Sequence, residues 1–196
     1  PSVAFLVSGP EVGIRISAKA GDATTADAMI AGVEDEVVKR LGAAVYGRDT
    51  DTVEGILASE LRARGWRAAF VEAATLGAVA TTFAAVGDTA FAGGLTVPPE
   101  PVDAGTDLED RAMRLLDQAD AVLHGDVGVA VTEAHGDQPG PRSTQSLAVA
   151  VRTPERTQTR VVSLLGDGGR VREYACGTVL HLARLAVTGV WWRPLA

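Results

Sequence analysis

The stretch VYGRDTDTVEGILASELRARGWRAAFVEAATLG, residues 45–77, decides the fold of this chain. Residues 52–64 carry apolar side chains at helical spacing, and Gly65 ends the predicted helix. Residues 68–71 form a short apolar run, which is typical of a buried strand, and a second helix is expected through about residue 85. A helix, a strand and a helix in this order indicate a layered α/β domain.

The rest of the chain extends this pattern in both directions. Downstream we predict helices at 108–123 and 169–187, a buried strand at 127–132, paired strands at 147–152 and 160–165, and loops at 97–107 and 134–144. Upstream we predict a hairpin of strands 3–7 and 12–17, a helix at 25–41 and a short closing strand at 44–46. We therefore expect two domains: a small α+β unit, 1–47, and a larger α/β domain, 48–196.

Composition limits the class of protein. The chain has 196 residues, 46% of them apolar and 22% charged, which is enough for a globular core, and its apolar runs are too short to span a membrane. A net charge of −7 argues against a nucleic-acid partner. A single cysteine excludes an internal disulfide and fits a cytoplasmic protein. Pro1 is not an initiator residue, so we expect the chain either to begin inside a longer protein or to have been processed.

Several stretches resemble the C-terminal region of CinA-type proteins. Residues 45–77 match that family's tyrosine-glycine, acidic linker, helix, strand and AESCTGG loop. VAVTEAHGDQPG, residues 129–140, stands where the family has a VTGIAGP-like loop, and LLGDGGRVREYA, residues 164–175, where it has a GDR loop. Residues 1–46 resemble the KH-like unit before this domain. The resemblance implies an α/β/α sandwich of the CinA C-terminal type behind a small α+β, KH-like unit, in a bacterial protein of the competence- or damage-inducible type.

The resemblance also implies a chemistry. In the family, this domain hydrolyses the amide of nicotinamide mononucleotide, with a serine of AESCTGG as nucleophile and a lysine of a later YSNEAK-like segment to activate it. Here the serine position is Ala73, the cysteine position is Ala74 and the first glycine is Leu76. The lysine segment begins at Gly93 but continues into a proline-rich run, and the chain's two lysines, Lys19 and Lys39, lie far upstream. Nucleophile and base are both missing, which predicts a degenerate active site and no catalytic residue.

Part of a substrate-binding scaffold remains. Positions that match the family or could contact a substrate are Glu72, Thr75, Gly77, Thr132, Gly136 and Arg172. Glu133 replaces a glycine, where its charge would repel a phosphate. Thr75 or Thr96, with Glu72 or His135 as base, are weak substitutes for the missing pair. For Glu72 we favour a structural role, in which it holds the loop through backbone N–H groups.

Other candidate sites have simpler interpretations. His-Gly-Asp occurs at 124–126 and at 135–137, but the intervening strand separates the two triplets by roughly 20 Å, so they cannot share a metal ion. Cys176 and His181 do not share a helix face, and a buried structural thiol is favoured. Trp191 and Trp192 are interpreted as a packing anchor or an oligomer contact. We expect no metal and no cofactor.

The leading hypothesis is a deamidase-fold domain without catalysis that has a structural, oligomerising or regulatory role. A homo-oligomer is the expected assembly, and a pyridine nucleotide is a possible ligand of the altered pocket. The first alternative is a nicotinamide-nucleotide amidohydrolase with a rebuilt active site, giving nicotinic acid mononucleotide and ammonia. The second is a nucleotide sensor that binds without chemistry.

Overall fold

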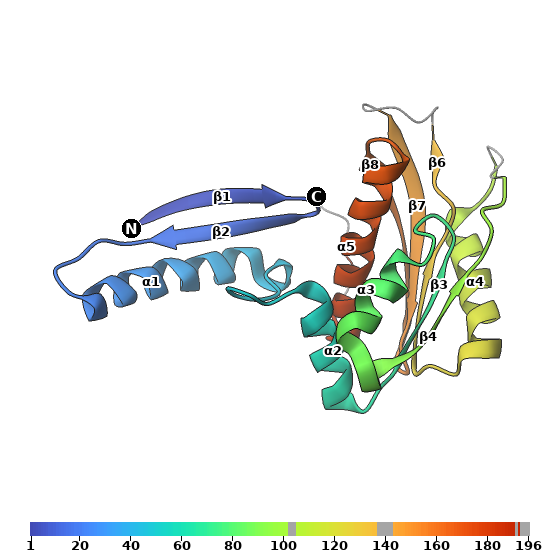
Figure 1. Ribbon diagram of the computed structural model, residues 1–196, viewed down its shortest axis with the longest axis horizontal. Helices are drawn as coiled ribbons and strands as arrows, with labels where there is room; N and C mark the ends of the chain where they lie inside the picture. Colours follow the sequence, from blue (N-terminus) through green and yellow to red (C-terminus); the bar gives the residue numbers. More distant parts are fainter. Residues whose placement is uncertain (102–104, 137–142, 191, 193–196) are drawn as a thin grey trace.

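A mixed six-stranded sheet organises most of the chain (Figure 1). The computed structural model describes residues 1–101, 105–136, 143–190 and 192. Its sheet contains β3 (Ala68–Glu72), β4 (Phe91–Thr96), β5 (Val127–Val131), β6 (His135–Gly136), β7 (Thr144–Arg152) and β8 (Thr157–Leu165). β3 lies between β4 and β5 and is parallel to both, whereas β7 runs antiparallel to β5, β6 and β8.

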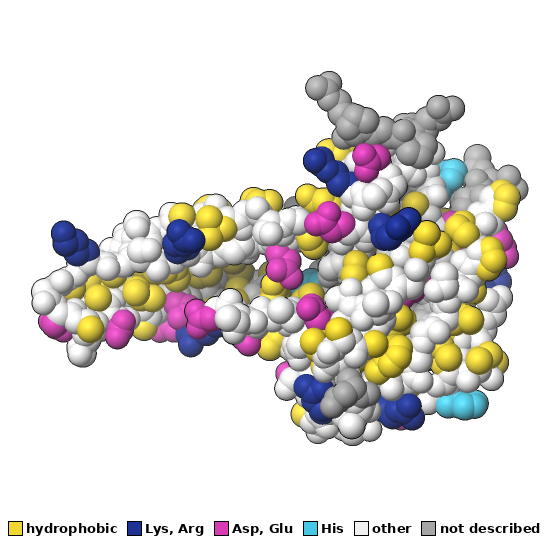
Figure 2. Space-filling view, viewed as in Figure 1, with side chains coloured by type: hydrophobic (Ala, Val, Ile, Leu, Met, Phe, Trp, Pro, Cys, Tyr) yellow, Lys and Arg dark blue, Asp and Glu magenta, His cyan; other side chains and the backbone are white. Residues whose placement is uncertain are grey.

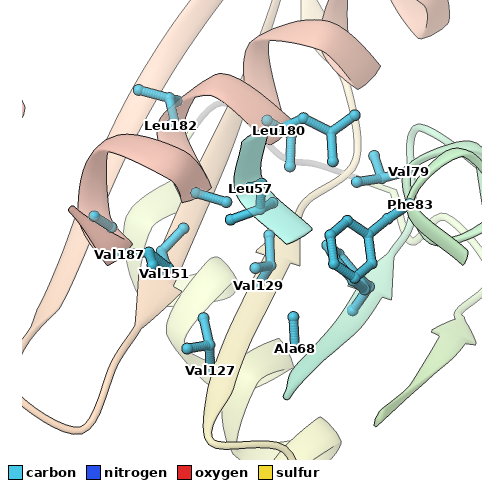
Figure 3. Packing of buried hydrophobic residues seen from close by; sticks show 14 of the residues in the cluster. Leu57, Ala68, Val79, Phe83, Val127, Val129, Val151, Leu180, Leu182 and Val187 are labelled. Atoms are coloured by element: carbon cyan, nitrogen blue, oxygen red, sulfur yellow. The ribbon is translucent and has the colours of Figure 1, made fainter. Parts of the chain in front are cut away.

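Helices cover both faces of this sheet. On one face lie α2 (Val53–Arg64), α3 (Ala78–Gly87) and α5 (Gly168–Val187), which bury a cluster that includes Leu57, Phe83 and Leu180 against alternate strand residues (Figure 3). On the other face α4 (Leu108–Leu123) packs through Leu115 and Leu116. The expected α/β/α layering is confirmed.

Local sequence signals set the helix ends. The Thr52 side chain accepts a hydrogen bond from the Gly55 amide at the start of α2, and Gly65 ends that helix in the left-handed conformation, with φ 66°. Asp107 caps α4 in the same manner, and Asp167 caps α5. The predicted helix bounds therefore agree with the structure to within a residue or two wherever a cap marks them.

The N-terminal unit is an arm beside the sheet domain (Figure 1). It consists of the antiparallel pair β1 (Ser2–Ser8) and β2 (Glu11–Ser17), then α1 (Ala23–Leu41) and a short 3-10 helix (Gly42–Ala44). None of these elements contains a buried residue, and hydrophobic side chains reach the surface along the arm (Figure 2). The division of the chain at 47/48 stays a prediction.

Three expectations about secondary structure were wrong. The predicted loop 134–144 contains β6 and the first residue of β7, because His135 and Gly136 pair with β7. Residues 44–46 are not a closing strand, because Gly42–Ala44 turns as a 3-10 helix and no strand lies beside it for pairing. β4 was not predicted, because its glycine-rich sequence FAGGLT has no clear alternation; it is a strand because it pairs in parallel with β3. A further 3-10 turn (Asp88–Ala90) leads into it.

Candidate functional site

The loop after β3 is the centre of the candidate site. Residues 73–77 join the end of β3 to the start of α3, and their backbone is tied to β5, because the Ala73 amide donates to the Val131 carbonyl and the Ala74 amide to the Thr132 carbonyl. Parallel strands end at the same edge of a sheet, so this loop meets the residues that follow β5. The structure thus brings together Glu72, Thr75 and Thr132 from separate parts of the sequence.

Glu72 is a buried cap of α3. Its side chain is 1% exposed, and its carboxylate accepts three hydrogen bonds: from the Thr75 hydroxyl at 2.5 Å, the Val79 amide at 3.0 Å and the Ala80 amide at 2.7 Å. Amides of the first helical turn lack helical partners and carry partial positive charge, so a carboxylate stabilises them. The structural role expected for Glu72 agrees with this geometry.

The position that the resemblance assigns to the nucleophile offers no reactive group. Ala73 has a methyl side chain and is fully buried. Thr75, the nearest hydroxyl in the loop, is also fully buried and uses its proton in the bond to Glu72. Thr96 lies nearby: a Cβ placed at Gly77 would be 3.1 Å from its hydroxyl.

Leu76 and Gly77 give the loop its shape. Both have positive φ, 52° and 87°. A glycine adopts this conformation freely, whereas a leucine pays about 1–2 kcal/mol for it. The leucine that replaces the first family glycine therefore sits in a glycine conformation, with its side chain half exposed.

Thr132 also has a structural partner on each side. Its hydroxyl donates to the Glu133 carbonyl at 3.0 Å and accepts from the Ala148 amide at 2.9 Å. Gly136 lies on β6, where a Cβ would collide with the Thr144 carbonyl, so this glycine is explained by the strand pairing. Neither residue presents a free polar group to a ligand within the described residues.

A buried ion pair was not anticipated from the sequence. Arg111 of α4 donates to Glu133 at 2.8 Å through Nη2, and the Glu100 amide donates to the same carboxylate at 3.2 Å. Arg111 also lies 3.2 Å from the Glu100 carboxylate. Burial alone would raise the pKa of Glu133, but hydrogen bonds from Arg111 and from backbone amides outweigh it and keep the pKa below its usual value. The sequence did contain one indication of this pair: Arg111 lies on the apolar face of the predicted helix 108–123, where a buried arginine needs an acidic partner.

The remaining candidates lie apart from the loop. His135 is exposed on β6 and has no hydrogen bond to Thr75 or Thr96 in the described part of the chain. Arg172 lines a cavity between α5 and the arm, and Thr132 is not among the residues that line it. The start of α5 is capped by Asp167, which accepts from the Arg170 amide at 3.2 Å, so a carboxylate already occupies this anion-binding position.

The other sequence motifs have structural explanations. His124 ends α4 and His135 follows β5, so the two triplets lie at opposite ends of one strand, while Asp137 lies outside the described residues. The residues that the structure describes contain no group of three or more metal-ligating side chains. The Cys176 thiol donates to the Thr82 hydroxyl at 3.6 Å, and burial raises its pKa. Trp192 anchors the chain end through its indole N–H to the Leu182 carbonyl at 3.1 Å, whereas Trp191 lies outside the described residues.

Solved structures define the class of this fold. The described chain resembles the competence-damaged protein (CinA) superfamily protein from Enterobacter cloacae, with a TM-score of 0.57 and 21% identity over 73% of this chain and 96% of that one. The superfamily member from Klebsiella pneumoniae 700603 gives a TM-score of 0.60 and 16% identity over 71% and 97%. The chain therefore has the mixed α/β fold of these CinA superfamily structures.

Sequence comparisons place the chain within a family. Residues 1–47 match the model of the damage-inducible protein CinA KH domain. A CinA-like protein of Frankia casuarinae is 32% identical over 97% of this chain and 48% of its own length, and a protein of Geobacillus kaustophilus described as competence-damage inducible is 27% identical over 93% and 49%. The chain belongs to the CinA family and spans about half the length of these relatives. No helix in its described residues is long and apolar enough to cross a membrane.

Proposed function

We propose that the α/β domain of this CinA-family chain does not hydrolyse nicotinamide mononucleotide and serves instead as a structural or regulatory domain. The observation that carries the proposal is the use of Glu72: its carboxylate holds Thr75 and the first turn of α3, so it is committed to the fold. A general base needs an accessible lone pair in reach of a nucleophile and a substrate. A residue that is 1% exposed and accepts three hydrogen bonds offers none.

The missing lysine supports the same conclusion. Lys19 lies between β2 and α1, and Lys39 lies near the end of α1, so both exposed ammonium groups belong to the arm. All other permanent cations of the chain are arginines, which stay protonated and do not act as bases. A lysine-activated hydroxyl therefore has no counterpart in the α/β domain.

The Arg111–Glu133 pair supports loss of substrate binding as well. Arg111 is a buried cation beside the end of β5, and Glu133 already neutralises it. A phosphate that approached this end of the sheet would find no free cation in Arg111, because this residue is buried and already paired with the ionised Glu133 carboxylate, whose pKa is below its usual value. Under this proposal the site lacks a partner for the nucleotide's phosphate as well as the groups for the chemistry.

Ammonia release from nicotinamide mononucleotide by the purified chain tests this proposal, with an active family member as positive control. We expect no release above background in the parent chain. Turnover that is lost in Thr75→Val or Glu72→Gln would overturn the proposal and establish the alternative, an amidohydrolase with a rebuilt active site. Calorimetric titration with the same nucleotide separates the sensor hypothesis, because binding without turnover would assign the pocket to ligand sensing.

The structural role predicts a self-association that can be measured. A homo-oligomer is expected, and sedimentation equilibrium of the chain would give its mass directly. If the chain is a monomer at all concentrations, the hypothesis of an oligomerising role is wrong. The remaining hypothesis would be that the domain supports a further, catalytic domain.

A further inference from the structure

A cavity of about 410 Å³, widely open to solvent, lies where the arm meets the α/β domain. Its walls come from the β1–β2 turn and from α2, α3 and α5, and the polar groups that line it are Glu11, Glu54, Thr82, Arg172, Glu173 and Cys176. It is distinct from the loop of residues 73–77, none of which lines it. Junctions between structural units are frequent positions of small-molecule sites, and this volume suits a ligand of modest size.

Close backbone packing fixes the walls. Pro10 of the turn lies against Gly177 of α5, where an added Cβ would be 2.5 Å from the proline ring. Gly9 has φ 54°, and a Cβ there would lie 2.8 Å from the Glu173 carboxylate. In Figure 1 the end of the hairpin accordingly lies beside α5. A glycine on each side lets the turn seat closely, so the cavity exists before any ligand arrives.

The floor of the cavity is apolar and neutral. Val53 and Leu180 are buried there, together with the Cys176 thiol, which bonds to Thr82. Burial raises the pKa of this thiol, so it is protonated at neutral pH. Above this floor, Pro10 and Ala78 line the cavity and are not buried, so they offer apolar surface to a hydrocarbon or aromatic body.

Charges of both signs line the cavity. Arg172 and Glu173 are exposed to solvent and Glu54 is partly buried, and none of the three side chains forms a hydrogen bond or ion pair with a residue that the structure describes. Glu11 differs, because it accepts a hydrogen bond from Tyr46. Two free carboxylates and one free guanidinium favour a ligand that carries a cation and, for Arg172, an anion as well.

We propose that this cavity binds a small zwitterion of the amino-acid type, with an ammonium group and a carboxylate on an apolar body. The ammonium group pairs with Glu54 and Glu173, the carboxylate pairs with Arg172, and the body lies against Pro10 and Ala78, apolar lining residues that are not buried. The proposal goes beyond the proposed function and does not depend on it, since ammonia release and binding at this cavity are separate measurements.

Isothermal titration with three molecules that share an indole body tests this assignment: L-tryptophan has both charges, tryptamine has the cation alone and indole-3-propionate has the anion alone. We expect tryptophan to bind with a Kd of about 1 mM or tighter. Each single-charge analogue should bind at least about tenfold more weakly, because one charged group of the cavity is left unpaired. Absence of measurable binding by all three, or tryptamine binding as tightly as tryptophan, would overturn the proposal.

Two arginine variants make the test specific to the cavity. Arg172→Gln should weaken tryptophan binding by about tenfold and leave tryptamine unchanged, because only the carboxylate loses its partner. Arg170→Gln is the matched control. Arg170 is exposed, lies half a turn away on α5 and does not line the cavity, so the Arg170→Gln variant should bind tryptophan with the same affinity as the parent chain. Equal effects of the two substitutions would show that binding occurs elsewhere.

Discussion

Replacing Glu72 by glutamine separates a structural carboxylate from a catalytic one. The substitution keeps the size of the side chain but replaces one acceptor oxygen by an amide NH₂. In the parent chain, the Ala80 amide donates to one carboxylate oxygen at 2.7 Å, and the Thr75 hydroxyl and the Val79 amide donate to the other. If the glutamine oxygen keeps the bonds from Thr75 and Val79, its NH₂ group faces the Ala80 amide. Two donors then meet in a buried site, and one charge-assisted hydrogen bond is lost.

The size of the effect follows from that geometry. A hydrogen bond to a charged group contributes about 1.5–3 kcal/mol, so we expect Glu72→Gln to lower the free energy of unfolding by about 2 kcal/mol. Glu72→Ala leaves all three donors unpaired and should cost about 4 kcal/mol or more, although such contributions do not add strictly. Urea denaturation followed by circular dichroism measures both values.

Glu109→Gln is the matched control. Glu109 also lies in the first turn of a helix, α4, but its carboxylate has no hydrogen bond within the described residues, so the change should stay within about 0.5 kcal/mol. If Glu72→Gln unfolds at the same urea concentration as the parent, the carboxylate does not hold the loop, and the structural interpretation is wrong. A stable Glu72→Gln protein that had lost a hydrolytic activity would assign Glu72 to catalysis.

Three further predictions concern the loop, a partly buried histidine and the buried ion pair. Leu76→Gly should be more stable than Leu76→Ala by about 1 kcal/mol, because φ at this position is 52°, whereas alanine is usually the more stable of the two residues. Equal unfolding midpoints for the two variants would show that the backbone at residue 76 is not strained. Burial, followed by the charge of Arg184, lowers the pKa of His181 from 6.5 to about 4, so only the unfolded state takes up a proton between these values. The free energy of unfolding should therefore fall by about 2 kcal/mol as the pH falls from 6.5 to 4, after allowance for the partial exposure of His181. His181→Gln should remove this pH dependence of the free energy of unfolding. The control His124→Gln, at an exposed position, should keep it. Glu133→Ala leaves Arg111 buried without its main partner and should cost about 3 kcal/mol in thermal or urea unfolding, against less than about 1 kcal/mol for the exposed pair of Arg40 in Arg40→Ala.

The sequence predicted the elements that carry their own local signals. α4 was predicted at its observed bounds, because its apolar face repeats at helical spacing. The hairpin and α2 were likewise predicted from their turn and stop residues. β4 lacked such a signal: Gly93 and Gly94 depress strand propensity, and Gly94 is required because a Cβ there would meet the Ala80 side chain at 2.6 Å. Its strand conformation depends on pairing with β3, which no local pattern encodes.

The candidate site was predicted in part, for the same physical reason. Glu72 and Thr75 are three residues apart, so one loop brings them together, and their hydrogen bond follows from local geometry. Arg172 was placed in the site by its order in the sequence alone, yet α5 carries it to the cavity beside the arm. The Arg111–Glu133 pair joins residues 22 positions apart on a helix and a strand end, and only the packing of α4 on the sheet brings them into contact.

The polar groups around the loop bind one another, which is the main physical argument for the proposed loss of catalysis. Removing a nucleophile alone would leave the groups that served it buried without partners, at a cost of about 1–3 kcal/mol each. Here Thr75 and the amides of α3 bind Glu72, the Thr132 hydroxyl binds backbone on both sides, and Glu133 neutralises Arg111. Leu76 is the exception, because it keeps the conformation of a glycine without the side chain that suits it. The side chains of Glu72, Thr75 and Thr132 thus have internal partners. Under the proposed function, restoring activity would therefore require Ala73→Ser, a new lysine and the removal of Glu133 together.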